Sequence, residues 1–305
     1  MYNYPSSSAS STPPPSYEAL NRSLNNVFIS KTAMQQSPSM HRPSTPIDWI
    51  NECFRNAFKT GHLRHIDVFA WIHGRKPDLI LPNHVGDAFQ DAVCVGVDLE
   101  QMVGDRSKAV TEIGVFTLPV KRVVNGETFL SPLVNMEVHH ARVRENAHKE
   151  SDPPLGPFAD KFQFGCSTFV TMDECRTLLR RCLGLENPVP RRTRHIVLIG
   201  HAISNDVEDI NEQFGINLDD AGVIAVTLDT QIMAGELGIG HAAGKPISLG
   251  KLIDLLDIKV DYLHNGGNDI VATVLAAYAM LKMVQNFPDD HRGNQAYLLH
   301  SLRDH

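Results

Sequence analysis

The spacing of apolar residues changes twice along the chain, near residue 46 and near residue 89. Residues 1–45 are rich in Ser and Pro and poor in large apolar side chains. Such a segment cannot bury enough surface to offset the entropy that it would lose on ordering, so we expect a disordered tail. Residues 288–305 are expected to form a second, C-terminal tail.

Apolar residues at helical intervals begin directly after the N-terminal tail. Those that share the spacing are Ile47, Ile50, Phe54 and Phe58. Pro46 suits the first turn of a helix and Gly61 its end, and another apolar cluster follows at 66–72. We predict that residues 46–88 form a short helical extension packed on the main domain, with their Trp and Phe rings in the core.

Residues 89–287 alternate strand-like and helix-like segments, which is typical of an α/β domain. Residues 93–99 show a buried-strand pattern, and 110–118 look like the hairpin partner of that strand. Further strands are expected at 133–138, 194–199 and 223–228, and helices at 173–183, 205–214, 249–256 and 269–284. Residues 139–165 are polar and contain Pro, which indicates a long loop or insertion.

Cap residues mark the ends of two of these helices. Asn205 and Glu208 stand three apart, as in a capping box, and Gly215 follows as the stop signal. Ser248 is placed to cap the helix that begins after it. We therefore predict that local side chains fix where both helices begin.

The charge balance limits the classes of function. Lys and Arg total 28 and Asp and Glu total 35, giving a net charge of −7, whereas a protein that coats nucleic acid normally carries a strongly basic surface. An enzyme that handles nucleic acid through metal ions and a small basic patch agrees with these numbers. With 42% hydrophobic residues, the chain can build a packed core over most of its length.

The expected location is intracellular, in the cytoplasm, the nucleus or both. The cysteines are odd in number and form no CxxC pair, so we interpret them as reduced thiols and not as disulfides or a zinc site. They are Cys53, Cys94, Cys166, Cys175 and Cys182. We find no apolar run near membrane-spanning length, and the N-terminus lacks the basic and apolar regions of a signal peptide. A soluble protein without membrane contact is expected.

Candidate chemistry lies in three acidic segments. Asp98 and Glu100 stand two apart at the end of the first strand, so both carboxylates share one face. Carboxylates held that close repel unless one is protonated or a divalent cation relieves them. Asp206 falls in the first turn of a helix, and His264 precedes a flexible glycine turn after which Asp269 opens the last helix. Singly, each is also explained as an ordinary strand-end, helix-start or surface residue.

Taken in order, the three segments resemble the DnaQ-like DEDDh exonuclease family. Residues 111–114 (TEIG) resemble its second-strand signature, 228–230 (LDT) a later strand end, and 248–249 the start of the helix before the third motif. The resemblance covers about residues 93–284. It implies an RNase H-like fold, in which a mixed sheet is flanked by helices.

A fungal branch of this family is similar in two more segments, 161–165 (KFQFG) and 264–269 (HNGGND). That branch is represented by the nuclease-like C-terminal domain of the yeast "good for full DEAD-box activity" factor. Positions that depart from the general family pattern are Gln101, Met102, Ala202, Gly266 and Ile270. No departure removes a carboxylate or the His, so these positions bear on the substrate and leave the metal site intact.

The resemblance implies a metal-dependent nuclease that removes nucleotides from DNA or RNA. Its catalytic residues would be Asp98, Glu100, Asp206, His264 and Asp269. The four carboxylates would hold two Mg²⁺ or Mn²⁺ ions, with Asp98 bridging them, because oxygen ligands without Cys suit these cations. His264 would be the general base, and the family implies 3′-to-5′ action on a single-stranded end. Phosphate contacts are sought at Arg191, Arg192, Arg194, Lys245 and Lys251.

Two other interpretations stay open. The fold also suits a non-catalytic module that binds nucleic acid or proteins in RNA metabolism, such as mRNA export or silencing. A degenerate module would be expected to lose a carboxylate or the His, and this chain keeps all five. Pro14, Pro15 and Tyr17 spell a PPxY ligand for WW domains, although a chance tetrapeptide explains them equally well. The sequence does not distinguish DNA from RNA or indicate an oligomeric state.

Overall fold

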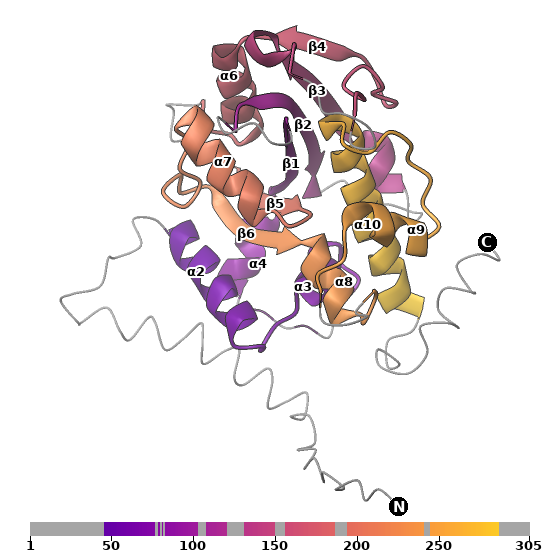
Figure 1. The fold of residues 1–305 in the computed structure, drawn as a ribbon. Helices are drawn as coiled ribbons and strands as arrows, with labels where there is room; N and C mark the ends of the chain where they lie inside the picture. The colour runs from indigo at the N-terminus through magenta and orange to yellow at the C-terminus, as the bar shows by residue number, and fades with distance from the viewer. Residues whose placement is uncertain are drawn as a thin grey trace, which may run out of the picture.

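The computed structural model describes residues 46–76, 79, 81, 83–102, 108–120, 131–149, 156–186, 194–240 and 245–286. In this part of the chain, helices flank a six-stranded mixed sheet of order β4-β3-β2-β1-β5-β6 (Figure 1). The strands are β1 (Val93–Gln101), β2 (Val110–Pro119), β3 (Glu137–Val143), β4 (Ser167–Val170), β5 (Ile196–Gly200) and β6 (Ile224–Asp229). The predicted RNase H-like α/β class is confirmed. Both predicted tails and the PPxY motif lie outside the described residues.

The central strand β1 has an antiparallel neighbour on one side and a parallel neighbour on the other. β2 is its antiparallel partner, as predicted, and the register places Glu100 opposite Glu112. β5 runs parallel to β1, with Ile196 beside Val93. Because parallel neighbours end at the same edge of a sheet, the segment after β5 emerges beside Asp98 and Glu100.

Helices cover both faces of the sheet (Figure 1). They are α2 (Pro46–Lys59), α3 (His65–Ile72), α4 (Asn83–Phe89), α6 (Met172–Cys182), α7 (Ser204–Phe214), α8 (Thr230–Glu236), α9 (Leu249–Leu255) and α10 (Gly266–Asn286). Val95 and Val97 of β1 share one hydrophobic core with α6 and α7, whereas Cys94 shares the other core with α10. Alternate strand residues point to opposite faces, so the even-numbered residues of β1 face α10.

The helical extension before β1 packs on the α10 side of the sheet, as predicted. Its helices α2, α3 and α4 contribute to the same hydrophobic core as α10. Phe54 is fully buried, and Trp71 meets Phe89 edge to face at 5.4 Å between ring centroids. These aromatic rings are therefore core residues. The carboxylate of Glu236 holds the start of α3 by accepting hydrogen bonds from the amides of His65 and Ile66.

One predicted strand had wrong boundaries, and one strand was not predicted. The third strand was expected at 133–138, but β3 begins at Glu137, after the short 3-10 helix η2 (Ser131–Asn135). β4 lies just beyond the stretch that was predicted to be a loop. β4 is the edge strand and β3 lies next to it, and both carry polar or exposed side chains, so their apolar signal is weak. A second short 3-10 helix, η3 (Arg144–Asn146), follows β3.

Helix caps agree with the sequence at two positions and differ at one. Gly215 ends α7 in the left-handed region (φ 62°), and the Ser248 side chain accepts a hydrogen bond from the Lys251 amide at the start of α9. The capping box predicted at Asn205 is absent, because α7 begins one residue earlier without a side-chain cap. The residues just before the helix are held by Asp229 of β6, whose carboxylate accepts hydrogen bonds from the amides of Ala202 and Ile203.

The last helix is longer and more apolar than predicted. Residues Gly266–Val284 of α10 are long and apolar enough to cross a membrane, which corrects the expectation that no such run exists. However, 83% of that stretch is buried inside the structure. An apolar helix surrounded by its own domain is what a core helix requires, and we interpret α10 in this way.

Candidate active site

Asp98 and Glu100 lie on the face of β1 that α10 covers. A Cβ atom on Gly96, two residues before Asp98, would come within 2.8 Å of Ile270 in α10. This close approach brings the first turn of α10, which carries Asp269, beside the end of β1. The local sequence explains both elements. β1 is an apolar strand whose last residues alternate between acidic and other side chains, and α10 is an apolar helix that begins with an acidic turn.

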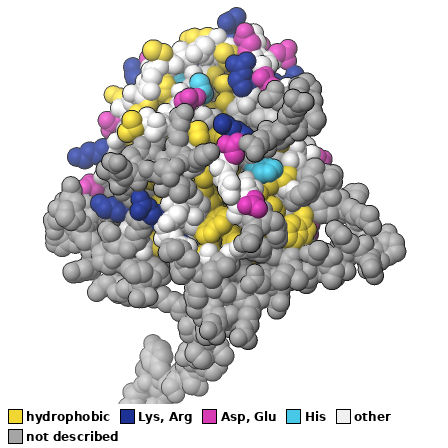
Figure 2. Space-filling model, turned by 180° about the vertical axis from the view of Figure 1, so that it is seen from behind, with side chains coloured by type: hydrophobic (Ala, Val, Ile, Leu, Met, Phe, Trp, Pro, Cys, Tyr) yellow, Lys and Arg dark blue, Asp and Glu magenta, His cyan; other side chains and the backbone are white. Residues whose placement is uncertain are grey.

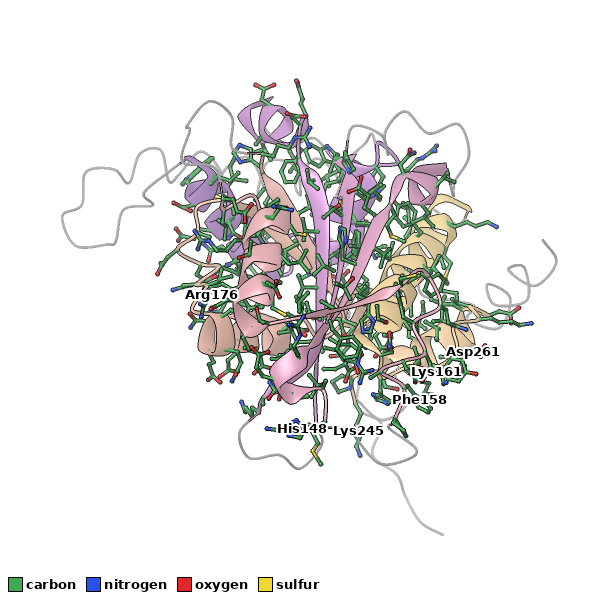
Figure 3. All side chains as sticks on the ribbon, turned by 90° about the horizontal axis from the view of Figure 1, so that it is seen from above. His148, Phe158, Lys161, Arg176, Lys245 and Asp261 are labelled. Carbon is green, nitrogen blue, oxygen red and sulfur yellow. The ribbon has the colours of Figure 1, made fainter. Side chains whose placement is uncertain are left out.

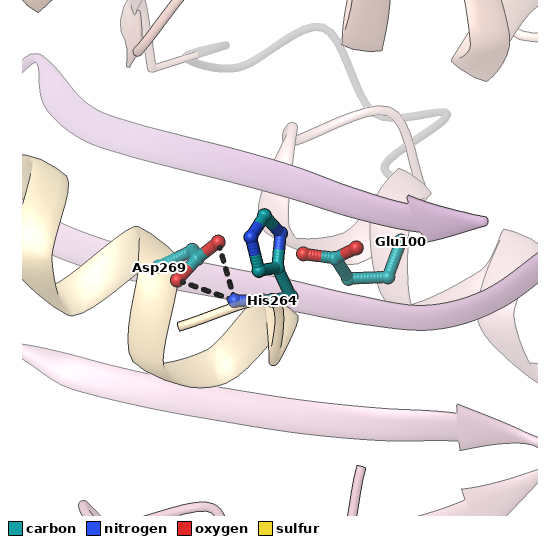
Figure 4. A group of neighbouring side chains, drawn as sticks. All are labelled: Glu100, His264 and Asp269. Atoms are coloured by element: carbon teal, nitrogen blue, oxygen red, sulfur yellow. Dashed lines mark hydrogen bonds between the residues drawn. The ribbon is translucent and has the colours of Figure 1, made fainter. Parts of the chain in front are cut away.

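Glu100, His264 and Asp269 form the tightest part of the site (Figure 4). One ligand atom from each lies within 4.8 Å of the others. The main-chain amide of His264 donates to both carboxylate oxygens of Asp269, at 3.2 and 3.1 Å. His264 itself has φ 65°, a conformation that costs energy for a residue with a side chain. The exposed imidazole of His264 is thus held beside two acids.

Asp206 reaches the site from the opposite face of the sheet. It lies in the first turn of α7, is 8% exposed, and accepts a 2.9 Å hydrogen bond from the amide of Leu99. Leu99 stands between Asp98 and Glu100 in β1. The structure therefore brings all five predicted residues to one end of β1, with Asp98 and Asp206 next to the Glu100 group.

The site favours protons or cations over bare negative charge. Burial, followed by the neighbouring carboxylates, raises the pKa of Asp98 and of Glu100 well above the usual range. Burial also raises the pKa of Asp206 and of Asp269 to about 7, although amide hydrogen bonds oppose the rise. Partial burial lowers the pKa of His264, so its imidazole is neutral near pH 7, the form that accepts a proton.

One buried oxygen tests whether a cation fits. Oδ2 of Asp98 is buried, and no described residue gives it a hydrogen bond. A buried carboxylate oxygen without a donor is costly unless it is protonated or bound to a cation. The surrounding donors are carboxylates and one imidazole, which suits Mg²⁺ or Mn²⁺. The residues present therefore fit a divalent ion.

A fifth acid was not singled out by the sequence analysis. Glu112 of β2 is 5% exposed and lies opposite Glu100, and its charge contributes to the raised pKa of Asp98 and Glu100. Its carboxylate is 2.8 Å from Nε2 of the buried His140, whose Nδ1 lies 2.8 Å from the Ser167 hydroxyl. The motif TEIG contained this Glu, but only the strand register shows that it faces the site.

The glycines after His264 do not form the predicted flexible turn. α10 begins at Gly266, three residues before the expected start. A Cβ atom on Gly114 of β2 would lie 1.8 Å from the carbonyl oxygen of Gly266, so the helix end and the strand touch through their backbones. Glycine is needed here for this close approach, and it fixes where α10 meets the sheet.

Other residues considered from the sequence lie elsewhere or have structural partners. Arg194 precedes β5 and is 3.8 Å from Asp91, so it lies at the opposite end of the strands from Glu100. His201, which follows β5, has a partner at each ring nitrogen: the Thr230 hydroxyl and the Ile247 carbonyl, both at 3.0 Å. Lys245 and Lys251 are exposed, and Arg191 and Arg192 lie outside the described residues.

Comparisons with known proteins identify the family of the folded part of the chain. The family model described as "DNA polymerase III subunit epsilon-like, C-terminal domain" matches residues 93–280, more than half of the chain. An uncharacterized nucleolar protein of Schizosaccharomyces pombe is 27% identical over 53% of this chain and 58% of its own length. The Saccharomyces cerevisiae protein "Good for full DBP5 activity protein 2" is 25% identical over 66% of this chain and 36% of its own. The match thus spans only part of each relative.

Proposed function

The chain belongs to the family of DNA polymerase III subunit epsilon-like DEDDh domains, and on that basis we propose that it is a metal-dependent nuclease. The proposed reaction is hydrolysis of phosphodiester bonds in DNA or RNA from a 3′ end. The observation that carries the proposal is the complete set of four acids and one His at the end of β1. A protein that kept the fold only for binding would have no need of this costly cluster of buried charge.

We assign roles from position. Asp98, Glu100, Asp206 and Asp269 would hold two divalent ions, which when bound would stabilise the negative charge that develops on the phosphate and the leaving oxygen. His264 is neutral, exposed and beside Glu100, as a general base for the attacking water requires. Asp269 fixes the His264 loop through the amide of His264. The amide of Leu99 orients Asp206.

Side chains at the rim of the site suit a nucleic-acid strand. A hollow beside Glu100 and His264 is also lined by Lys149 and Phe158. The ring of Phe158 lies 5.7 Å from that of Tyr262, which is 45% exposed. Lysine attracts phosphate and aromatic faces stack on bases, so an unpaired strand end is the proposed substrate. On the face in Figure 2, the described Lys and Arg side chains are interspersed with acidic ones, without a broad basic block.

The test is degradation of end-labelled DNA and RNA oligonucleotides by the purified protein with Mg²⁺, with Mn²⁺ and with excess EDTA. We expect shortening from the 3′ end only with a cation, and no cleavage of circular single strands. Glu100→Gln should lose this activity, whereas Asp254→Asn, an exposed acid in α9, should keep it. Binding of oligonucleotides without cleavage by the parent protein would instead support a non-catalytic module in RNA metabolism.

A compartment and a protein partner can also be proposed. The name of the Schizosaccharomyces pombe relative places that protein in the nucleolus, so we propose the nucleus as the first compartment to examine. A WW-domain partner for Pro14, Pro15 and Tyr17 is a separate proposal. It is tested by capture of the full chain on an immobilised WW domain, with Tyr17→Ala as the control.

A further inference from the structure

The loop that carries His264 is joined to a distant segment by two buried amide side chains. These are Asn265 and Asn268, both 0% exposed, in the stretch between His264 and Asp269. The distant segment is 158–163, about a hundred residues earlier in the chain. Figure 3 shows Phe158, Lys161 and Asp261, which belong to the joined segments, on the same side of the molecule.

Asn268 uses its whole amide group on main-chain atoms. Its Nδ2 donates to the carbonyl oxygens of Lys161 and Tyr262, each at 3.1 Å, and of Asp261 at 3.3 Å. Its Oδ1 accepts the amide of Gln163 at 3.0 Å. One side chain thus connects segment 158–163, the approach to His264 and the first turn of α10.

Asn265 adds a second connection. Its Nδ2 donates to the carbonyl oxygens of Phe158 and Ala159, at 3.0 and 3.3 Å, while its Oδ1 accepts the amide of Asn268 at 3.1 Å. Phe158 and Ala159 line the hollow beside Glu100 and His264. The first residues of segment 158–163 therefore form a wall of the hollow that His264 also lines, and the two amide side chains are bonded to this wall segment.

We infer that Asn265 and Asn268 are positioning residues, which hold the wall segment 158–163 and the His264 loop as one rigid unit. This inference rests on the proposed nuclease function for its kinetic part. A buried amide that satisfies several main-chain groups is strongly specified, and reacting groups lose rate when their supports loosen by even a fraction of an ångström. Among the described residues, the hydrogen bonds of both side chains go to main-chain atoms and not to the four carboxylates, so the two amides would act on the geometry of the site.

The chain offers near-isosteric tests. Asn265→Asp keeps the oxygen that caps α10 and sets the other carboxylate oxygen against the carbonyl oxygens of Phe158 and Ala159. Asn268→Asp sets a carboxylate oxygen against three carbonyl oxygens. Asn146→Asp is the matched control, because Asn146 donates a 2.9 Å hydrogen bond to the Val110 carbonyl and lies outside the unit formed by the wall segment and the His264 loop. For each variant we would measure kcat and KM on a labelled oligonucleotide, Mn²⁺ affinity by titration, and amide hydrogen exchange.

We expect kcat to fall about 10- to 100-fold in Asn265→Asp and further in Asn268→Asp, with Mn²⁺ affinity within threefold of the parent. Exchange should rise in segment 158–163 and around His264, while β1 and β2 stay protected. Unchanged kcat and unchanged wall protection would overturn the inference, as would exchange that rises throughout the domain. If the parent protein cleaves nothing, the proposed function fails. Amide hydrogen exchange in the wall segment of the variants still decides whether the two amides hold that segment and the His264 loop together.

Discussion

The main-chain amide of Leu99 donates a 2.9 Å hydrogen bond to the carboxylate of Asp206. Asp206 is thereby tied to the strand position between Asp98 and Glu100. This main-chain hydrogen bond therefore joins the start of α7 to the acidic end of β1, and it fixes the place of Asp206 beside the other carboxylates.

Removal of a bridging acid should abolish both metal binding and activity. Asp98 would hold both ions, and no described residue donates a hydrogen bond to its buried Oδ2. Mn²⁺ at a hundredfold excess over its Kd should stabilise the parent by about 2.7 kcal/mol, because it binds only the folded site. Thermal melts with and without Mn²⁺ check this. A full gain in stability in Asp98→Ala would contradict the assignment of Asp98.

His264→Ala should separate the base from the metal site. We expect a loss of about two to four decades in single-turnover rate, which is the usual contribution of a general base. Metal affinity should change little, although the imidazole lies close enough to Glu100 and Asp269 to share a cation. Titration of Mn²⁺ against His264→Ala decides between the two roles. Weaker binding of Mn²⁺ together with slower cleavage would show that His264 is a metal ligand.

Gly114→Ala should displace the start of α10. The added methyl group would fall 1.8 Å from the carbonyl oxygen of Gly266, and backbone atoms cannot rotate out of the way as a side chain can. Overpacking of this kind costs about 1–3 kcal/mol or more, and the shift would carry His264 and Asp269 with it. Denaturant unfolding and cleavage should both decline. Gly86→Ala, with nothing within 4 Å of the new atom, is the control.

Ala202→Gly should stabilise the protein. Ala202 has φ 54°, a left-handed conformation that costs an Ala about 1 kcal/mol and a Gly almost nothing. After the greater flexibility of Gly in the unfolded chain is subtracted, we expect a gain of about 0.5 kcal/mol in the free energy of unfolding. Ala279→Gly, within α10, should instead lose about 0.5–1 kcal/mol. The same sign for both variants in urea unfolding would refute the argument.

Glu236 should give the fold a pH dependence that is independent of the active site. Burial raises the pKa of Glu236 to about 7, even though the amides of Ile66 and His65 lower it. The folded state prefers the protonated form of Glu236, so protonation of this group contributes to the free energy of unfolding. That contribution is fully present below the pKa of Glu236 in the unfolded chain and is lost as the pH rises through about 7. The loss is on the order of 2 kcal/mol.

Comparison with Glu236→Gln isolates this contribution. The variant cannot ionise at residue 236, so its free energy of unfolding should fall less between pH 4.5 and 8 than that of the parent. The measurement is urea unfolding of both proteins across this range, read as the difference between them. If the free energies of unfolding of the two proteins changed in parallel with pH, ionisation of Glu236 would not destabilise the parent.

The sequence was informative where signals are local. The period-two alternation of β1 placed Asp98 and Glu100 on one face, and the apolar run of α10 placed Asp269 at a helix start. Glu112 could not be recognised in this way, because its position opposite Glu100 depends on strand register, which a single strand does not specify. The pairing of Glu112 with His140 depends on the same register.

Contacts between distant segments were also beyond local reasoning. The wall at 158–163 was predicted as part of a loop, and its bonds to Asn268 span more than a hundred residues of sequence. The start of α7 is a second case: it has no side-chain cap, and Asp229, 26 residues away from Ile203, accepts a hydrogen bond from the Ile203 amide just before the helix. Tertiary partners replaced local ones in both places.

Asp206 and Asp269 project from helices on opposite faces of the sheet, and Asp98 and Glu100 belong to the strand between them. Ions shared by these acids would be a reversible crosslink through all three layers, joining segments that lie far apart in the sequence. Without the ions, the first turns of α7 and α10 can open separately, each at its own free-energy cost. If ions were bound, those openings would become a single cooperative event, so resistance to local unfolding would follow the supply of divalent cation in the compartment.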